Sequence, residues 1–167
     1  MRMCSKSPEA RIASNIDKIA LAVFETYKEQ CRLQGRTVQY ERMEDQPADL
    51  RQSNYAQAEH IPVKVQALGY ELVPIDECGA DLAIDELTPE QIEVVARLEH
   101  ERFVQERIAA GWTLDRSIQK GDAEHKRSPF LVPYDELEYD IQEYDRDTAR
   151  QMIPLLRMAG LAMVRQC

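Results

Sequence analysis

Three stretches in the second half of the chain decide how the rest of the sequence is interpreted. They read HERFVQERIAAGW (100–112), SPFLVPYDEL (128–137) and EYDRD (143–147). Apolar residues at helical spacing in the first stretch predict a helix that stops at Gly111, and Trp112, the only tryptophan, follows at once. A polar loop then leads to Leu-Val-Pro and to a second helix that we expect to open within the third stretch.

Composition favours a single acidic domain. The chain has 167 residues, of which 44% are hydrophobic and 31% charged, and its net charge is −9. This charge disfavours nucleic acid and anionic lipid as partners. No run approaches the roughly 20 apolar residues of a membrane helix, and no signal peptide is recognisable at the start, so a cytoplasmic location is expected.

The cysteines and histidines show no metal-ligand spacing. Four free thiols, no structural metal and no cofactor are therefore expected. The residues are Cys4, Cys31, Cys78 and Cys167, with His60, His100 and His125.

The first half predicts a helix, a loop, a second helix and a strand, after a flexible leader over residues 1–13. Ser14 is a candidate N-cap with Asp17 in a capping-box position, and Pro62 must kink or divide the second helix. The elements are a helix from Ser14 to about Gly35, a loop over 36–48, a helix from Asp49 to Gly69, and a strand over 70–74.

The second half predicts the same order after an acidic connector over 76–87. Thr88, Pro89 and Gln91 form a strong helix start, because Thr caps, Pro fits the first turn and Gln can close a capping box. The elements are a helix from Thr88 to Gly111, a loop over 112–127, a helix from about Asp145 to Gly160, and a strand over 161–164.

The two halves align as an internal repeat. A shift of 76 places Gly35 on Gly111, and a shift of 91 places Gly69 on Gly160 and Asn54 on Asp145. A helical hairpin with one strand cannot bury its apolar side alone, so two copies are expected to face each other across a pseudo-twofold axis. The predicted fold is mainly α with short β-strands and four main helices. It is one domain over 14–167, with repeat one over 14–75, the connector over 76–87 and repeat two over 88–166.

This order of motifs resembles the ryanodine-receptor repeat (RyR) domain. The family pattern runs His, an aromatic, a basic residue, Gly-Trp, a loop, Leu-Val-Pro-aromatic and an Asn/Asp-Arg helix start. RQSNYAQAEHIPVKVQALGYELVP (51–74) is similar to prokaryotic members. The resemblance implies paired repeats, and it implies that the Asn and Trp positions of both halves suit a nucleotide cleft.

Trp112, Asn54 and Asp145 each have two interpretations. Trp112 either fills a gap between helices or forms a stacking platform for a planar ligand. Asn54 and Asp145 are either N-caps of the two second helices or part of a polar cleft in which paired helix starts favour an anion. Arg146 or Arg36 would then compensate the charge of Asp145.

The basic residues of the second half also have two interpretations. Arg107 belongs either to a solvated, salt-bridged helix face or to a binding site, and Lys126 lies in a loop that either is solvated or clamps an anion. The complete candidate ligand-binding set is Trp112, Asn54, Asp145, Arg146, Arg107, Arg36, Lys126 and Tyr134.

The leading hypothesis is a non-enzymatic sensing or binding module that holds a nucleotide or another small anion in the cleft between the repeats. The alternative is a protein-interaction or scaffold module of a larger signalling or channel-regulating assembly, for which exposed Tyr139, Tyr144 and Phe130 would serve. His100 is the one candidate general base, and no nucleophile motif or second convergent acid accompanies it.

Overall fold

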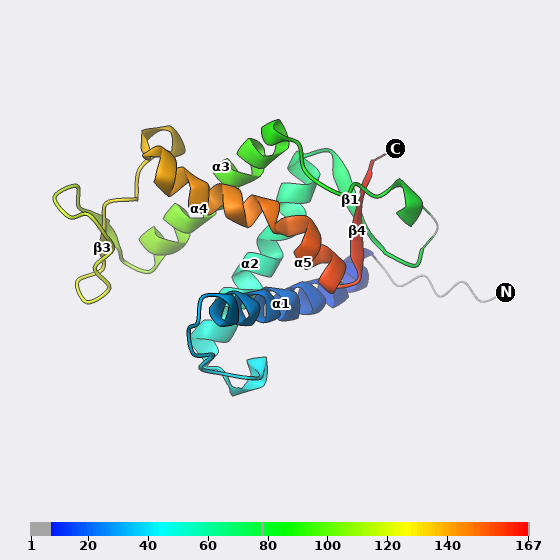
Figure 1. Cartoon of the computed structure of the whole chain (residues 1–167), viewed down its shortest axis with the longest axis horizontal. Helices are drawn as coiled ribbons and strands as arrows, with labels where there is room; N and C mark the ends of the chain where they lie inside the picture. The colour runs from blue at the N-terminus through cyan, green and yellow to red at the C-terminus, as the bar shows by residue number, and fades with distance from the viewer. Residues whose placement is uncertain (1–7, 78, 167) are drawn as a thin grey trace. The chain divides into compact units, whose positions relative to one another are not determined.

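The computed structural model describes residues 8–77 and 79–166 and forms two compact units. The first unit contains the chain up to Asp85 and again from Met152, and the second contains Glu86–Gln151. Helices dominate both units and the strands are short, as predicted (Figure 1). Among the described residues, none of the helices combines the length and apolar character needed to cross a membrane.

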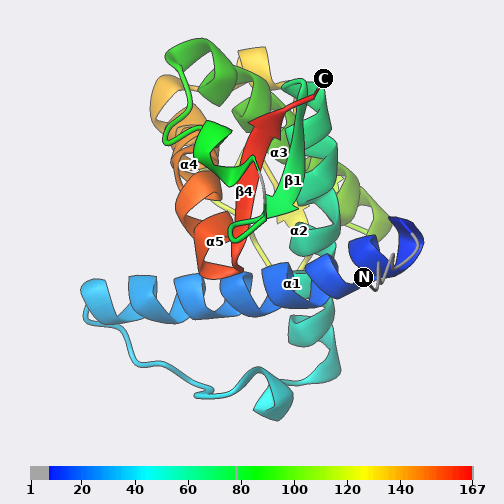
Figure 2. The same ribbon diagram turned by 90° about the vertical axis from the view of Figure 1, so that its right-hand side faces the viewer.

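The first unit is built around a two-stranded antiparallel ladder between segments from the two ends of the chain. Leu72 lies opposite Met163 at the centre of this ladder. In Figure 2 the strands β1 and β4 lie side by side, with α2 on the β1 side and α5 on the β4 side. The elements are α1 (Pro8–Leu33), η1 (Met43–Asp45), α2 (Ala48–Ala67), β1 (Tyr70–Pro74), η2 (Ala80–Leu82), α5 (Met152–Met158) and β4 (Leu161–Arg165).

Apolar side chains from α1, α2, α5 and β4 are almost completely buried. Burying each one removes on the order of 1.5–3 kcal/mol of unfavourable hydration, which helps to hold the C-terminal segment against the N-terminal helices. They include Ile19, Phe24, Val65, Leu156, Leu161 and Met163.

The second unit is a helical hairpin with a long loop. Figure 1 shows α3 and α4 side by side and running in opposite directions. A cluster of Ala96, Val132, Tyr134 and Leu137 fills the space between the hairpin and the segment that returns from the loop. The elements are α3 (Pro89–Ala109), β2 (Thr113–Leu114), β3 (Arg127–Ser128), η3 (Tyr134–Glu136) and α4 (Tyr139–Arg150).

The predicted capping box at the start of α3 is confirmed. The Thr88 hydroxyl accepts a hydrogen bond from the Gln91 N–H at 3.2 Å, and the Gln91 side chain accepts one from the Thr88 N–H at 2.9 Å. Two of the helix's free amide groups are thereby satisfied.

The internal repeat is confirmed at the level of the elements. Adding 91 to the bounds of η1 and β1 gives the bounds of η3 and β4, and the same shift carries the start of α2 to the start of α4. Adding 76 to the last residue of α1 gives the last residue of α3. Leu72 and Met163, which are equivalent under the 91-residue shift, face each other in the β1–β4 ladder, so the ladder is locally twofold about this pair.

The start of the first helix was predicted wrongly. Helix α1 begins at Pro8, not after Ser14, so Ser14 lies inside the helix. Pro8 suits the first helical position and Glu9 suits the first turn, which makes PEARIAS a helix start in its own right. Residues 1–7 of the predicted leader lie outside the described residues.

The second helix of the second half also differs from its prediction. It begins at Tyr139, and it is interrupted at Gln151 between α4 and α5. Pro154 has no N–H to donate to the carbonyl of Arg150, which explains a break one turn before the proline. Pro62 of the first half, which misses Pro154 by one position under the 91-residue shift, does not divide α2, which runs without interruption.

Candidate functional site

Trp112 is positioned by the way α3 ends. Gly111 takes a left-handed conformation with φ 86°, which a residue with a side chain rarely adopts. The Gly111 N–H donates to the Ile108 carbonyl at 3.0 Å, and the Trp112 N–H donates to the Arg107 carbonyl at 2.9 Å. The indole is therefore attached to a closed helix end and is partly exposed.

The guanidinium of Arg107 lies over two aromatic rings. It is 4.8 Å from the centroid of Trp112 and 5.2 Å from that of Phe103. Within the described part of the chain Arg107 makes no ion pair, and its side chain is partly exposed. A cation on aromatic faces with no carboxylate partner keeps its donors available to an anion.

The loop that follows is tied back to the end of α3. The Thr113 N–H donates to the Lys126 carbonyl at 2.9 Å, and the Lys126 ammonium donates to the Ala110 carbonyl at 3.0 Å. A cation is favourable there because the C-terminal end of a helix carries partial negative charge. A shallow open pocket runs along residues 118–123, and Gly121 in it lies against the Trp112 ring.

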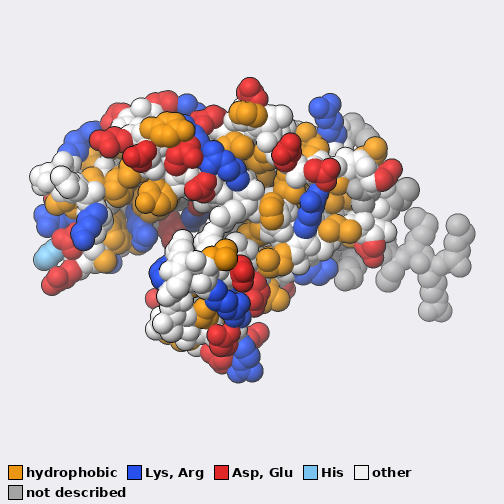
Figure 3. Space-filling model, in the orientation of Figure 1, with side chains coloured by type: hydrophobic (Ala, Val, Ile, Leu, Met, Phe, Trp, Pro, Cys, Tyr) orange, Lys and Arg blue, Asp and Glu red, His pale blue; other side chains and the backbone are white. Residues whose placement is uncertain are grey.

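Several charges of this loop are paired with one another. Arg127 donates to Asp115 at 3.0 Å and to Asp122 at 3.2 Å, and His125 lies 2.8 Å from Asp122. The hydrogen bonds from His125, with a further one from Arg127, lower the pKa of Asp122 to about 2. Acidic and basic side chains accordingly intermingle at the loop-bearing end on the left of Figure 3, and the loop is not uniformly basic.

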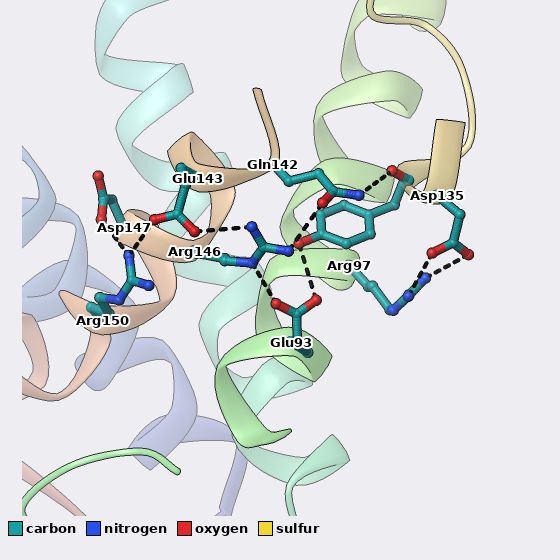
Figure 4. Close-up of polar contacts among 9 residues, drawn as sticks. Glu93, Arg97, Asp135, Gln142, Glu143, Arg146, Asp147 and Arg150 are labelled. Carbon is teal, nitrogen blue, oxygen red and sulfur yellow. Dashed lines mark hydrogen bonds and ion pairs between the residues drawn. The ribbon is translucent and has the colours of Figure 1, made fainter. Parts of the chain in front are cut away.

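A second cluster of candidate residues lies between α3 and α4 (Figure 4). The Arg146 guanidinium donates to Glu93, to Glu143 at 2.9 Å and to the Gln142 side chain at 3.0 Å. It also lies 4.8 Å from the centroid of the Tyr139 ring. Each of its three nitrogens thus donates to a side chain of the protein, so Arg146 joins the two helices and is less available to an anion than an unpaired arginine.

Tyr134 belongs to the same cluster. Its hydroxyl donates to Glu93 at 3.2 Å, and Arg97 lies over its ring at 4.8 Å while donating to Asp135 at 2.9 and 2.6 Å. Burial, followed by the charge of Glu93, raises the pKa of Tyr134 to about 12. Tyr134 is therefore a packed, neutral hydrogen-bond donor.

Asp145 faces His100, which is buried. The Nδ1 atom of His100 lies 3.5 Å from an Asp145 oxygen, and its Nε2 atom lies 2.6 Å from the Val132 carbonyl. The imidazole also stacks on the Phe103 ring and meets the Tyr134 ring at a tilt, each with its centroid 6.1 Å away. The candidate general base is thus engaged through both ring nitrogens.

Asn54 and Arg36 lie in the first unit. Asn54 is buried in α2 and donates to the Gln46 side chain at 2.8 Å, while Arg36 is exposed and lies 5.9 Å from the Tyr27 ring centroid. The expectation that Asn54 and Asp145 are N-caps was wrong. Both sit on the second turn of their helices, since the N-cap positions are taken by Pro47 and Glu138.

The sequence prediction missed Glu93 and the stacking role of Phe103. Glu93 is 53 residues from Arg146, and such a separation leaves no local pattern to find. Phe103 did leave one, because it lies four residues before Arg107 on the same face of α3.

Among the described residues, no group of three or more His, Cys, Asp or Glu side chains is arranged to hold a metal ion. Cys31, buried in α1, is a free thiol. Cys4, Cys78 and Cys167 lie outside the described residues.

The sequence model of the RyR domain matches residues 70–165, which is more than half of the chain. The chain belongs to the RyR domain family. No curated protein matches it. The RyR match runs from β1 to β4 and so includes the whole second unit, with Trp112, Arg107 and the α3–α4 cluster. The likeness of residues 51–69 to prokaryotic RyR members lies outside the matched range and stays a prediction.

Proposed function

We propose that this RyR-domain chain is a non-enzymatic binding module for a small anion with a planar group, a nucleotide being the first candidate. The proposed site is the end of α3 in the second unit, with Arg107 as the anion ligand and Trp112 as the stacking surface. Lys126 and Lys120 flank it from the loop. Of the candidate set from the sequence, Tyr134, Asp145 and Arg146 act in packing.

The observation that supports this proposal is that Arg107 contacts aromatic rings and no carboxylate among the described residues. Its guanidinium lies on Phe103 and Trp112 and makes no ion pair in the described part of the chain. Arginine presents planar, paired donors that match a phosphate or carboxylate, and an aromatic ring beside it suits a base. Arg146, by contrast, has Glu93, Glu143 and Gln142 as partners.

The binding role is supported over catalysis by the environment of His100. A general base needs a ring nitrogen within reach of a substrate proton. Both nitrogens of His100 face groups of the protein itself, and the side chain is buried.

Titration calorimetry of the full chain with AMP, ADP, ATP, cyclic AMP, adenosine and inorganic phosphate tests the proposal, with Trp112 fluorescence read in parallel. We expect saturable binding that quenches the fluorescence and weakens at least about tenfold in Arg107→Gln, which corresponds to one lost charged hydrogen bond. Arg116→Gln is the matched control, because Arg116 is an exposed loop arginine already paired with Glu136 at 3.1 Å. Binding that is equal in both variants, or absent throughout the panel, would contradict the proposal.

A second candidate function, a protein-interaction module, is favoured by two exposed tyrosines on α4. Tyr139 is 68% exposed and Tyr144 is 73% exposed, and tyrosine is enriched at protein interfaces. Tyr144→Ser leaves the Arg146 cluster untouched. If the module acts in this way, proteins retained from a lysate by the wild-type chain are lost with this variant and kept with Arg107→Gln.

A further inference from the structure

His100 makes two contacts that a neutral imidazole cannot satisfy together. Its Nε2 atom lies 2.6 Å from the Val132 carbonyl, and its Nδ1 atom lies 3.5 Å from Oδ2 of Asp145. The side chain is 4% exposed, so water is not available to replace either partner freely. Three segments of the second unit, α3, the irregular segment 130–133 and α4, meet at this one ring.

Both partners are hydrogen-bond acceptors. A carbonyl oxygen never donates, so Nε2 must carry a proton, and an ionised carboxylate likewise accepts only. A neutral imidazole has a single N–H and would point a lone pair at one of the two acceptors. Only the imidazolium, which donates from both nitrogens, satisfies both contacts at once.

The charged and titratable groups around the ring favour the same state. Asp145 faces it from α4, Glu99 lies next to it on α3 and is paired with Arg102, and the Tyr134 ring approaches from η3. The segment 130–133 contributes no ionisable side chain. The cations Arg146 and Arg97 are bound to Glu93 and Asp135.

We propose that His100 is a protonated clamp that fastens α4 to α3, and that raising the pH through its titration releases the α4 contact and loosens the second unit. Deprotonation releases only one of the two contacts of His100, the one with Asp145. A neutral His100 keeps its Nε2 proton on Val132, so the segment 130–133 stays bound while the Nδ1 lone pair faces the Asp145 carboxylate. The clamp residues His100, Val132 and Asp145 are not among the proposed ligand-binding residues.

The direction of the pH effect follows from the same contacts. Burial by itself lowers the pKa of His100, but the hydrogen bonds with Asp145 and Val132 and the nearby carboxylates outweigh it, so the pKa is raised. A raised histidine pKa adds stability that is fully present below the unfolded-state value of about 6.5 and is lost as the pH rises through the folded-state value.

The deciding experiment is a nitrogen-15 NMR titration of the imidazoles in the full chain, with His60→Gln and His125→Gln used for assignment. At pH 6.5 we expect His100 to show the imidazolium pattern, with both nitrogens protonated, and to lose the Nδ1 proton above its unfolded-state pKa. A neutral pattern with a proton on Nε2 alone at that pH would overturn the proposal.

Asp145→Asn gives a second, matched test. The asparagine amide can donate to a neutral Nδ1, so the His100 midpoint should fall by about one unit or more, as expected on removal of an opposite charge. Asp122→Asn is the control, because it removes the corresponding partner of the exposed His125 and should leave His100 unchanged. The stability advantage of wild type over Asp145→Asn should be larger at pH 6 than at pH 9, and an advantage equal at both pH values counts against the clamp.

Discussion

Arg146 links α3 to α4 through side chains that differ widely in exposure. Its own side chain is 13% exposed, while those of its partners Glu93 and Glu143 are 39% and 29% exposed. Such a partly buried pair contributes more than a surface ion pair, because water screens it less and each of the three guanidinium nitrogens donates a hydrogen bond. The same residue that the sequence offered as an anion ligand is therefore a structural one.

Replacing Arg146 by Ala should lower the free energy of unfolding by about 1–3 kcal/mol, because Glu93 loses its charged hydrogen bond and Tyr139 its stacked cation. The free energy of unfolding of Arg146→Lys should lie between those of wild type and Arg146→Ala, because lysine keeps the positive charge but lacks the paired donors of arginine. Urea denaturation measures both. Arg150→Ala is the control, as Arg150 is 45% exposed and its pairs should contribute less than about 1 kcal/mol. An equal loss in both alanine variants would contradict the assignment.

Asp122 is the residue whose acid titration is most clearly displaced. Hydrogen bonds from His125 and Arg127 hold its pKa at about 2, below the ordinary 3.8. A lowered carboxyl pKa adds stability that is present above the unfolded-state value and is lost as the pH falls through the folded-state value. Carbon-13 NMR of the Asp carboxyls should show Asp122 titrating near pH 2 in wild type and higher in His125→Gln. A midpoint that does not move in the variant would mean that His125 is not the cause.

At the scale of the element, α3 shows how local signals set a helix. Thr88 and Gln91 close its first turn, and Gly111 closes its last with a left-handed backbone. Helix α3 contacts α4 and η3, and its Ala96 belongs to the buried cluster with Tyr134 and Leu137. Residues close in sequence therefore set where α3 begins and ends, whereas tertiary packing sets its orientation relative to α4.

Thr88→Ala should lower the free energy of unfolding by about 1 kcal/mol, the usual contribution of an N-cap side chain. Thr148→Ala is the matched control inside α4. The Thr148 hydroxyl only donates back to the Tyr144 carbonyl at 3.1 Å, and alanine has the better helix propensity, so this change should be neutral or slightly stabilising. Thermal unfolding followed by circular dichroism compares them, and a larger loss at Thr148 would contradict the role of the cap.

At the scale of the whole molecule, the chain closes its first unit with residues from its far end. β4 pairs with β1 along five positions, and Ile84 donates a further backbone hydrogen bond to Met163 at 3.1 Å. Leu161, at the start of β4, is 1% exposed. The first unit therefore depends on a segment that follows the second unit in sequence.

Leu161→Ala should lower the free energy of unfolding by about 2–5 kcal/mol, because it removes buried methyl groups and leaves a cavity. Leu82→Ala is the control, since Leu82 is 73% exposed and should change stability by less than about 0.5 kcal/mol. Chemical denaturation of the full chain measures both. A small loss at Leu161 would mean that the β4 segment contributes little to the first unit.

Much of the fold was predictable because its signals are local. The strand bounds at residues 70–74, the capping box at Thr88 and the glycine stop at Gly111 each depend on residues a few positions apart, and the internal repeat follows from their spacing. The helix starts at Pro8 and Tyr139 were missed, since Ser14 and Asp145 offered equally plausible caps and only packing decides between competing local signals.

The sequence predicted which residues belong to the candidate site better than it predicted what each of them contacts. Trp112, Arg107 and Lys126 meet at the end of α3, where the sequence had placed only a tryptophan, a salt-bridged face and a polar loop. Arg146, Asp145 and Tyr134 were also singled out, but their partners lie far away in sequence. Polar side chains pair with the groups that lie close to them in space. The sequence alone does not give these distances, because they depend on how the helices pack.

The sequence by itself determined the elements, their repeated order and the RyR family to which the chain belongs, because helix ends, turns and motif spacing are encoded within a few residues. Only the tertiary structure decided that Arg146 forms an ion pair with Glu93 and that His100 lies between two acceptors. It also decided that Arg107 has no carboxylate partner among the described residues. The physical reason is that each of these states depends on which side chains packing brings within about 4 Å of one another, the range in which hydrogen bonds and ion pairs form.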